Sequence, residues 1–487
     1  MILISYYYFI INILFYFISF TLTKNSCQKK SYGLNSFVCV CSSKYYFQKR
    51  RKLNLPRIEI NINTSKKYQK IFGFGGAFTD SVGINLNQLS FNTRQKLLEQ
   101  YFNSENGIGY NIGRVPIASC DFSTHEYSYL DIPNNFSLNN FKLAPEDYEL
   151  KQHHGWMKTS GRMKGPGQLK GPFNGIYYRT YANYLKKFFE EYSIKNINFW
   201  GMTIENEPVA GSIPFYGWQA MYFSSKMQRD FAFNLLSPIF KESNITNKLK
   251  IIGHDDQRSG IYKAAKKIYE DLQKIDSIDG LATHWYSRSD YEILNQAHNF
   301  QPNKFIISTE ACNGYLPWEH KPLLGDWFRG QAYGHDILNN LKNWVIGWID
   351  WNLCLNLQGG PNWVGNFVDS PIIVNASADE FYKQPMFYFL AHFSHFIPRN
   401  SLVISSSLFI KKCKNELFKC ILNSININLI ENQIEHLALI TPNGNRILIL
   451  LNKSQENFDV IVKENNRSWN IPIKSNSIIT CIWKENE

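Results

Sequence analysis

The chain has 487 residues, which is long enough for a large catalytic domain and a smaller companion domain. Its formal net charge is +12, with Lys and Arg spread along the chain and no basic stripe or RNA-binding motif, so nucleic acid is not expected as a partner. The same charge is compatible with attraction to acidic lipid headgroups, and by itself it does not decide between partners.

Residues 1–23 are almost entirely apolar and are interpreted as a secretory signal peptide, although no basic residue precedes the apolar core. An uncleaved anchor is the alternative, because about 20 apolar residues can span a bilayer. The next segment, 24–54, holds Cys27, Cys39 and Cys41, which suits disulfide bonds in an oxidising compartment. No CxxC pair or paired histidines accompany these cysteines, and we therefore expect no metal and no other cofactor.

Seven short apolar runs follow, and each ends in polar residues. They alternate with amphipathic segments such as 175–192 and 261–273, which is typical of the parallel strands and helices of a (β/α)8 TIM barrel, placed here at residues 71–398. The one strand that is lacking should lie between Asp121 and Phe199, but residues 131–171 in that interval are polar and glycine-rich, so one βα unit is missing from the pattern. The seven runs are 72–80, 110–118, 199–208, 250–256, 280–286, 304–312 and 344–352.

The alternation of strands and helices ends after Gln384. Residues 447–451 and 477–483 are short β-branched runs separated by turn residues, which is typical of antiparallel strands. We therefore expect a second domain, an antiparallel β-sandwich formed by residues 399–487 together with the alternating strand in 55–70.

Two of the predicted barrel strands end on a glutamate, Glu207 and Glu310. If these two strand ends meet at one rim, the carboxylates can face each other across a sugar, as in glycoside hydrolysis with retention. We assign Glu310 as the nucleophile and Glu207 as the acid/base, and we expect the charge of Glu310 to raise the pKa of Glu207. An ordinary solvated glutamate at a strand end is the alternative for each residue taken alone.

Two further polar residues lie at predicted strand ends. Asn206 precedes Glu207 and has an amide that can bind a substrate hydroxyl, and Asp121 follows the strand 110–118. A plain turn aspartate is the alternative for Asp121.

The sequence resembles the glucosylceramidases, the lysosomal acid β-glucosidases of glycoside hydrolase family 30. The resemblance extends from about Ile71 to Pro398 and weakly over the C-terminal domain. The segments that carry it are 73–77, 114–122, 205–208, 284–286, 308–312, 350–352, 359–364 and 366–371.

The resemblance implies hydrolysis of β-glucosylceramide to glucose and ceramide, with retention, at acidic pH and without a metal. It implies that Glu207 is the acid/base and Glu310 the nucleophile. The residues that it places against glucose are Asp121, Asn206, Trp351 and Asn366, and those around the site are Tyr216, Trp218, His284, Trp285 and Tyr286.

The resemblance also implies partners and a location. A saposin-like activator and an anionic lipid membrane surface are the expected partners, and the chain is expected to follow the secretory pathway to the lysosome or the outside. Glycosylation on that route is consistent with Asn-x-Ser/Thr sequences at Asn63, Asn135, Asn244, Asn375, Asn452 and Asn466.

Three features depart from the family. The family carries a strand and a helix, ending in a glucose-packing tryptophan, where residues 151–155 stand here, which we read as a segment omitted from the coding sequence. Tyr46 stands where the family has a fourth N-terminal cysteine, so one disulfide should be absent. Residues 408–433 are an insertion without family counterpart, in which Cys413 and Cys420 could pair.

Two other functions therefore stay open. A chain without one βα unit could be a catalytically impaired homologue that binds a glucolipid, because an incomplete barrel leaves open sheet edges. The chain could also be a β-glycosidase of the same family that acts on sterol glucosides or a polysaccharide.

Overall fold

The computed structural model describes residues 16–17, 30–31, 37–38, 57–130, 132–144, 156–287, 290–411 and 433–484. The predicted signal peptide and the segment 24–54 lie outside the described residues except for three two-residue strands, β1 (Tyr16–Phe17), β2 (Lys30–Ser31) and β3 (Phe37–Val38). Cys413 and Cys420 lie outside them as well. The described cysteines, Cys120, Cys312, Cys354 and Cys481, are free thiols. The predicted disulfide bonds stay predictions.

The chain divides into two compact units, each of which is described by itself. One unit comprises residues 29–39 and 73–390, and the other comprises residues 1–28, 40–72 and 391–487. The domain boundaries expected from the sequence stay a prediction. Within the described ranges, no helix is long and apolar enough to cross a membrane.

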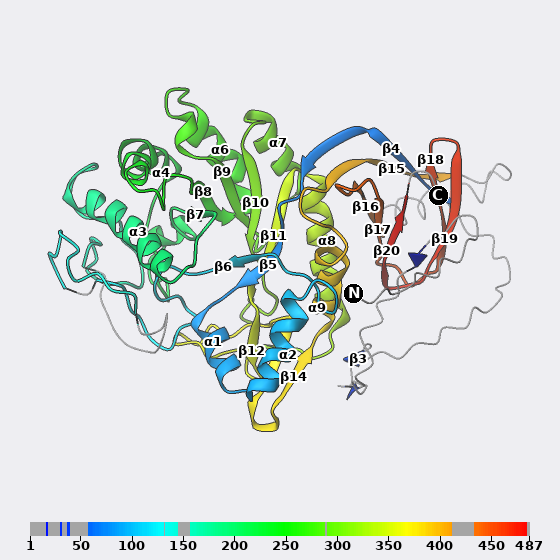
Figure 1. Cartoon of the computed structure of the whole chain (residues 1–487), viewed down its shortest axis with the longest axis horizontal. Helices are drawn as coiled ribbons and strands as arrows, with labels where there is room; N and C mark the ends of the chain where they lie inside the picture. The colour runs from blue at the N-terminus through cyan, green and yellow to red at the C-terminus, as the bar shows by residue number, and fades with distance from the viewer. Residues whose placement is uncertain are drawn as a thin grey trace, which may run out of the picture. The chain divides into compact units, whose positions relative to one another are not determined.

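The larger unit is a TIM barrel built on a curled parallel sheet (Figure 1). The described residues of this sheet form seven strands in the order β6-β5-β11-β10-β9-β8-β7, and every neighbouring pair is parallel. These are the seven predicted strands, and most of their residues are buried, as their apolar character predicts. Their bounds are β5 (Gly73–Ala77), β6 (Ile112–Arg114), β7 (Gly201–Thr203), β8 (Lys250–Gln257), β9 (Gly280–His284), β10 (Phe305–Glu310) and β11 (Val345–Asn352).

β6 and β7 are the two edges of this sheet, since each has one neighbouring strand in the described part of the chain. An eight-stranded barrel would hold one more strand between them, so the missing βα unit falls at this place. Between β6 and the next helix the described residues form loops with one isolated bridge of their own, Lys158–Leu169, and a second bridge joins Lys164 to Gln219, which lies beyond β7. The open edges leave strand backbone without a ladder partner.

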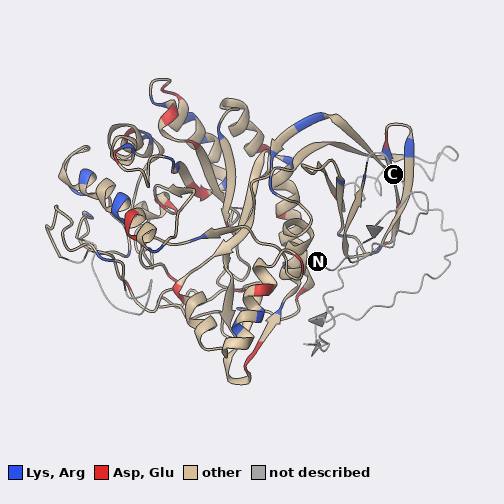
Figure 2. Cartoon of the chain, in the orientation of Figure 1, with Lys and Arg blue, Asp and Glu red and all other residues tan. Residues whose placement is uncertain are grey.

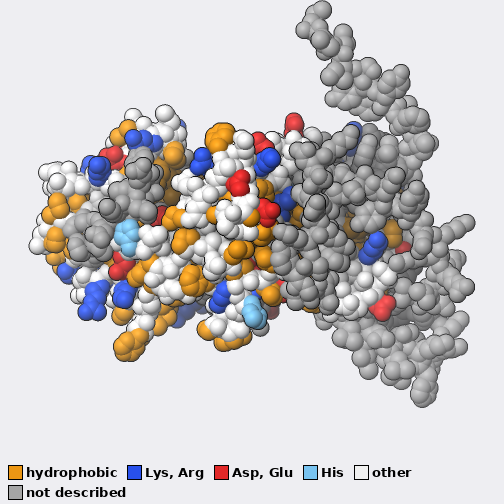
Figure 3. Space-filling model, turned by 90° about the horizontal axis from the view of Figure 1, so that it is seen from below, with side chains coloured by type: hydrophobic (Ala, Val, Ile, Leu, Met, Phe, Trp, Pro, Cys, Tyr) orange, Lys and Arg blue, Asp and Glu red, His pale blue; other side chains and the backbone are white. Residues whose placement is uncertain are grey.

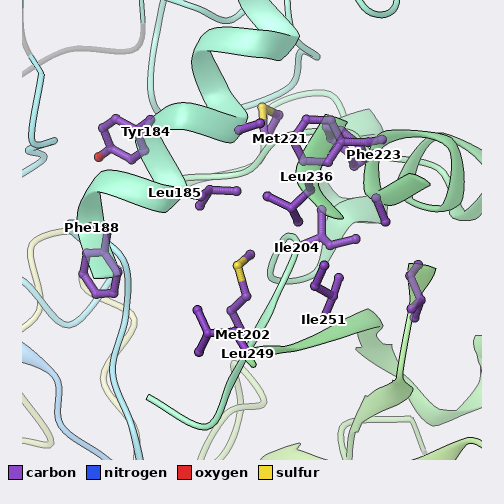
Figure 4. Close-up of a cluster of buried hydrophobic side chains, with 14 of the residues drawn as sticks. Tyr184, Leu185, Phe188, Met202, Ile204, Met221, Phe223, Leu236, Leu249 and Ile251 are labelled. Carbon is purple, nitrogen blue, oxygen red and sulfur yellow. The ribbon is translucent and has the colours of Figure 1, made fainter. Parts of the chain in front are cut away.

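Helix α3 (Ile176–Ile194) covers the β7 edge of the sheet (Figure 4). Its apolar residues recur at helical spacing, and Tyr184, Leu185 and Phe188 lie in one buried cluster with Met202 and Ile204 from the β7 segment. The predicted helical face is therefore confirmed. Burying the side chains of this face is what holds α3 against the sheet.

The other helices lie around the barrel strands, and several begin at a side chain that caps their first turn. Thr79, Ser90, Ser224 and Asp326 each accept a hydrogen bond from a backbone N–H two or three residues further on. Lys and Arg are distributed over the outer helices rather than along one stripe (Figure 2). The bounds are α1 (Asp80–Asn87), α2 (Phe91–Phe102), α4 (Ser225–Phe231), α5 (Ser237–Lys241), α6 (Ile261–Tyr269), α7 (Glu292–Phe300), α8 (Trp327–Lys342) and α9 (Pro385–Ser394).

The smaller unit is the predicted β-sandwich, built on an eight-stranded sheet in the order β1-β20-β17-β16-β15-β4-β18-β19. Neighbouring strands are antiparallel except β4 and β18, which are parallel, and β4 pairs with β15 on its other side. Apolar side chains from β4, β15–β20 form its core. The bounds are β4 (Arg57–Lys70), β15 (Leu402–Lys411), β16 (Ile434–Ile440), β17 (Arg446–Asn452), β18 (Phe458–Glu464), β19 (Arg467–Ile473) and β20 (Ser477–Trp483).

The first residues of the predicted insertion 408–433 lie in a strand. Residues 408–411 belong to β15 and pair with residues 57–60 of β4, so the alternating pattern of that strand continues further than expected. Residues 412–432 lie outside the described part.

A smaller sheet of β12 (Cys354–Asn356), β13 (Ile372–Asn375) and β14 (Glu380–Lys383) follows β11.

Candidate active site

Glu207 and Glu310 meet at the C-terminal ends of β7 and β10. One carboxylate oxygen of each and a ring nitrogen of His284 lie within 4.8 Å of one another. Glu310 is the last residue of β10, whereas Glu207 follows β7 with a left-handed φ of 44° and donates its N–H to the carbonyl of Asp255 at 2.8 Å. β7 itself ends at Thr203, before Glu207, so the strand is shorter than the sequence indicates, and Pro208 then begins a short helical turn.

Two donors hold Glu310. The Arg114 guanidinium lies 2.6 Å from Oε2, and the hydroxyl of Tyr286 donates to Oε1 at 2.9 Å. Arg114 also donates to the carbonyl of Thr309 at 3.1 Å. These bonds fix the rotamer of the carboxylate, and the Arg114 bond is charge-assisted and strong.

Arg114 joins both edges of the open sheet through its side chain. From the end of β6 its Nη2 donates to Oδ1 of Asn206, beyond β7, at 2.8 Å and lies 3.0 Å from Oδ2 of Asp255 on β8. The guanidinium carbon lies 5.5 Å from the centre of the Trp351 ring. One cation therefore contacts the carboxylate of Glu310, the amide of Asn206 and the buried carboxylate of Asp255 together.

Three donors surround Glu207. Oε1 accepts a bond from Nε2 of Gln257 at 2.8 Å and lies 3.1 Å from Nδ1 of His284. Oε2 accepts from the hydroxyl of Tyr216 at 3.2 Å. Glu207 is therefore held from β8, from β9 and from the loop that follows it.

His284 is buried between carboxylates. Its Nε2 lies 3.1 Å from Oδ1 of Asp255, which also accepts a bond from the hydroxyl of Thr309 at 2.6 Å. Burial disfavours a charged imidazole, but the charges of Glu310 and Asp255 and the hydrogen bonds to Asp255 and Glu207 outweigh it and raise the pKa of His284 to about 10. His284 is thus a cation that can donate from both ring nitrogens.

The expected pKa order of the two glutamates is reversed in the structure. Burial opposes the charge of Glu207, yet the hydrogen bond and charge of His284, with the bond from Tyr216, hold the pKa of Glu207 below its ordinary value. Burial raises the pKa of Glu310, and the charge of Glu207 adds to this while His284 and Arg114 oppose it. The sequence could not show that His284 donates to Glu207.

Asp121 lies beside this pair and bonds to the predicted Asn366. Nδ2 of Asn366 donates to Oδ2 of Asp121 at 3.0 Å, and Nδ2 of Asn362 contacts the same oxygen at 3.4 Å. Burial raises the pKa of Asp121 to about 7, with the charges of Glu310 and Glu207 adding to it. Near neutral pH Asp121 can therefore act as donor or acceptor to a hydroxyl.

The three predicted tryptophans differ in their surroundings. The Trp351 ring packs edge-on against Phe122 and faces the Arg114 guanidinium, which binds Glu310. Trp218 packs on Tyr216, with ring centres 4.6 Å apart. Trp285 donates its indole N–H to the carbonyl of Cys312 at 3.0 Å and packs edge-on against Tyr333, which is a structural arrangement.

Glu207, His284 and Glu310 have the geometry of a possible metal cluster. The donor set fits a metal poorly, because Arg114 already binds Oε2 of Glu310 and both ring nitrogens of His284 face carboxylates that favour its cationic form. A histidine binds a metal ion as a neutral imidazole, so a cationic His284 does not suit a metal ion.

Glu205 is a half-buried residue that follows β7, two positions before Glu207. The hydroxyl of Tyr181 contacts both the carbonyl of Ile204 and Oε2 of Glu205 at 3.2 Å. The Tyr181 hydroxyl has one proton, which it can donate to only one of these two oxygens. When Glu205 is protonated and donates to the hydroxyl, the hydroxyl can donate to the carbonyl of Ile204, and both bonds form. Burial raises the pKa of Glu205 to about 8, while Tyr181 and Lys158 oppose the shift.

Replacing Glu205 by Gln is expected to stabilise the protein at neutral but not at acidic pH. The raised pKa means that stability from Glu205 is fully present below its unfolded pKa of about 4.5 and is lost as pH rises towards 8, by up to about 5 kcal/mol. A neutral amide avoids this loss. Urea midpoints of the wild type and Glu205→Gln should be similar at pH 4.5 and separate at pH 7.5, and equal midpoints at both pH values would contradict the argument.

Sequence reasoning missed Arg114, Asp255, Thr309 and Gln257 as parts of the site. Arg114 and Thr309 stand inside strands that the sequence identified, and the polar run after residue 253 marked a strand end without showing which side chain enters the barrel. His254 and Asp255 both have left-handed φ, 73° and 48°, and this irregular end aims Asp255 inward. No sequence pattern signals that turn.

Comparisons with family models agree with the two units. The model of the glycosyl hydrolase family 30 TIM-barrel domain matches residues 71–154 and 152–397, and that of the family 30 beta sandwich domain matches residues 423–481. The barrel match is in two pieces that meet beside the gap between β6 and β7. The sandwich match begins inside the predicted insertion, so residues 423–433 do have a family counterpart, which corrects the sequence interpretation.

The chain is also similar to individual proteins over most of its length. It is 40% identical to "Putative glucosylceramidase 3" of Caenorhabditis elegans, covering 90% of this chain and 84% of that protein. It is 37% identical to "Lysosomal acid glucosylceramidase" of Mus musculus, covering 93% and 94%. The crystal structure of SrfJ from Salmonella typhimurium superposes with a TM-score of 0.75 at 24% identity, covering 91% and 95%, and supports the fold.

Proposed function

This chain belongs to glycosyl hydrolase family 30, and from that premise we propose that it is a retaining glucosylceramidase that splits β-glucosylceramide into glucose and ceramide. The proposed substrate rests on the relatives that are named glucosylceramidase. The proposed retention of configuration rests on the geometry of Glu207 and Glu310.

The observation that carries the retaining mechanism is the approach of Glu207 to Glu310, whose nearest carboxylate oxygens lie within 4.8 Å. Inverting glycosidases keep their carboxyl groups roughly 6.5–9.5 Å apart to admit a water molecule, whereas retaining ones keep them about 5–5.5 Å apart. The short separation favours direct attack by one carboxylate on the sugar.

In the first step, Oε1 or Oε2 of Glu310 attacks the anomeric carbon while the bond to the aglycone oxygen breaks. Glu207 gives its proton to that oxygen, so ceramide leaves as an alcohol. In the second step, Glu207 takes a proton from water, whose oxygen displaces Glu310 from the anomeric carbon. Two inversions give net retention.

The first step requires an ionised Glu310 and a protonated Glu207. In the free protein the pKa order is the opposite, because His284 and Tyr216 stabilise the ionised form of Glu207 while burial raises the pKa of Glu310. The proton must therefore lie on Glu207 in the complex with substrate, and kcat should fall as pH rises through the pKa of Glu207 in that complex. We propose the lysosome, on the secretory route, as the destination of this chain.

A lipid substrate also requires access from a membrane surface. The loop that follows Glu207 exposes three apolar side chains, with Val209 57%, Ile213 46% and Phe215 100% exposed. Helix α1 and strand β12 follow the ends of β5 and β11, and in Figure 1 they lie below these two strands. Figure 3 views the molecule from this side, where hydrophobic side chains are interspersed with polar ones. We propose an anionic lipid surface and a saposin-like activator as partners there.

The test uses the purified full chain with vesicles that contain glucosylceramide and an anionic phospholipid at pH 5. Release of ceramide, with β-glucose as the first sugar product by NMR, is the expected result. Initial release of α-glucose would refute retention. Addition of a saposin-like protein and omission of the anionic lipid measure the two partners separately.

A catalytically impaired glucolipid-binding protein is the second candidate, and the open sheet edges at β6 and β7 favour it. Calorimetric binding of glucosylceramide without hydrolysis would identify this function. Faster turnover of a sterol glucoside or a β-glucan than of glucosylceramide would instead indicate a different β-glycosidase of the same family.

A further inference from the structure

Gln257 reaches the acid/base from the end of β8. Its Nε2 donates to Oε1 of Glu207 at 2.8 Å. Its backbone is fixed, because its N–H donates to Oδ1 of Asp256 at 2.7 Å and its carbonyl lies 3.1 Å from Nε2 of His254. The amide is therefore held at Glu207 by the strand and not by a mobile loop.

The other end of this amide has no partner. Oε1 of Gln257 is buried without a hydrogen bond from any residue that the structure describes. Leaving a buried acceptor unsatisfied costs about 1–3 kcal/mol, and such groups in native proteins call for an explanation. A half-turn of the amide would place an acceptor against Glu207, so the carboxylate determines which way the amide points.

The two oxygens of Glu207 differ in their surroundings. Oε1 faces Nε2 of Gln257 and Nδ1 of His284. Carboxylates face both nitrogens of the His284 ring, so the ring donates to both when it carries two protons. Of the residues that the structure describes, Tyr216 alone bonds to Oε2, through a hydroxyl that rotates and can accept as well as donate.

We propose that Gln257 is a positioning residue that, together with His284, occupies Oε1 of Glu207 with N–H donors and so directs the catalytic proton to Oε2. An N–H group donates a hydrogen bond and cannot accept one. A proton on Oε1 of Glu207 would therefore face two donors, Gln257 and His284. A proton on Oε2 faces the Tyr216 hydroxyl, which can rotate so that its hydrogen points away from Oε2. The proposal rests on the proposed function, in which Glu207 protonates the leaving oxygen.

The groups that set the charge of Glu207 come from every element around it. His284 lies on β9, Glu310 on β10, Asp255 and Asp256 on β8, and Asp121 and Tyr216 on neighbouring loops. Gln257 is neutral, so its replacement by Leu removes one donor without adding a charge.

The experiment compares two β-glucosides, one with an alkyl aglycone that must be protonated to leave and one with a dinitrophenyl aglycone that leaves without a proton. For Gln257→Leu we expect kcat/KM to fall about tenfold with the alkyl glucoside and less than about twofold with the dinitrophenyl glucoside, since only the first needs general-acid catalysis. The alkaline limb of kcat/KM should move to higher pH, because the ionised Glu207 loses a donor.

The matched control is Gln384→Leu. Gln384 is also buried, donates to a carboxylate, Asp369, and has an unpartnered Oε1, but it contacts neither Glu207 nor Glu310. Its replacement should affect both substrates equally. If Gln257→Leu does not fold, Gln257→Met keeps the length of the side chain, also removes the donor without adding a charge, and should lower alkyl glucoside turnover with the same selectivity.

Equal losses with both substrates, or no loss with either, would overturn the proposal. Failure of the proposed function is distinguishable, because a wild-type chain that does not hydrolyse even the dinitrophenyl glucoside is not a glycosidase. A wild-type chain that hydrolyses both, with a Gln257→Leu variant that does not discriminate between them, refutes only the role of Gln257.

Discussion

Replacing Glu310 by Gln is expected to lower kcat for a fluorogenic β-glucoside at pH 5 by about 10⁴-fold or more, since the covalent step loses its nucleophile. The amide fits the same space and keeps an oxygen for Tyr286, which donates at 2.9 Å to the native residue. The variant should therefore fold, and circular dichroism with the thermal midpoint checks this. A loss of less than about tenfold would contradict the assignment of Glu310.

The nucleophile can also be identified without turnover. A 2-fluoro glucoside with a dinitrophenyl leaving group should add one fluoroglucosyl unit to the peptide that contains Glu310 in the wild type and not in Glu310→Gln. Glu292→Gln is the matched control, because Glu292 is an exposed carboxylate at the start of α7. It should retain full activity and full labelling at Glu310, and labelling elsewhere would exclude Glu310 as the nucleophile.

Replacing Arg114 by Met is expected to lower both activity and stability strongly. The guanidinium contacts Glu310, Asp255 and Asn206 at 2.6 to 3.0 Å. Its loss leaves two carboxylates in the barrel without their cation, and breaking such a largely buried pair costs about 3–5 kcal/mol. Because Glu310 also loses its orientation, we expect kcat to fall by about 10²-fold or more, measured on the folded fraction.

Arg329→Met separates the two effects. Arg329 is similarly buried and paired with the buried Asp369, but it does not contact Glu207 or Glu310. We expect a comparable loss of stability with kcat of the folded protein within about twofold of the wild type. If Arg114→Met lowers stability alone, Arg114 only supports the fold and does not orient the nucleophile.

Much of the barrel could be predicted because its strands have a local signature. The runs at β8 and β10 are apolar, short and followed by polar residues, which is what a parallel strand buried on both faces requires. The end of β15 was missed, although residues 408–410 are apolar, because these residues pair with β4, some 350 positions away. Local pattern cannot reveal a partner strand.

The sequence by itself determined the order of the elements, the barrel and β-sandwich, the two strand ends that carry Glu207 and Glu310, and the absence of a strand pattern between β6 and β7. These properties depend on residue type and spacing along the chain. The tertiary structure decided that Arg114 and Asp255 meet the nucleophile, and that His284 and Gln257 donate to Glu207. Hydrogen bonds and charges act over a few ångströms between residues far apart in sequence, so the protonation of this site follows from folded geometry alone.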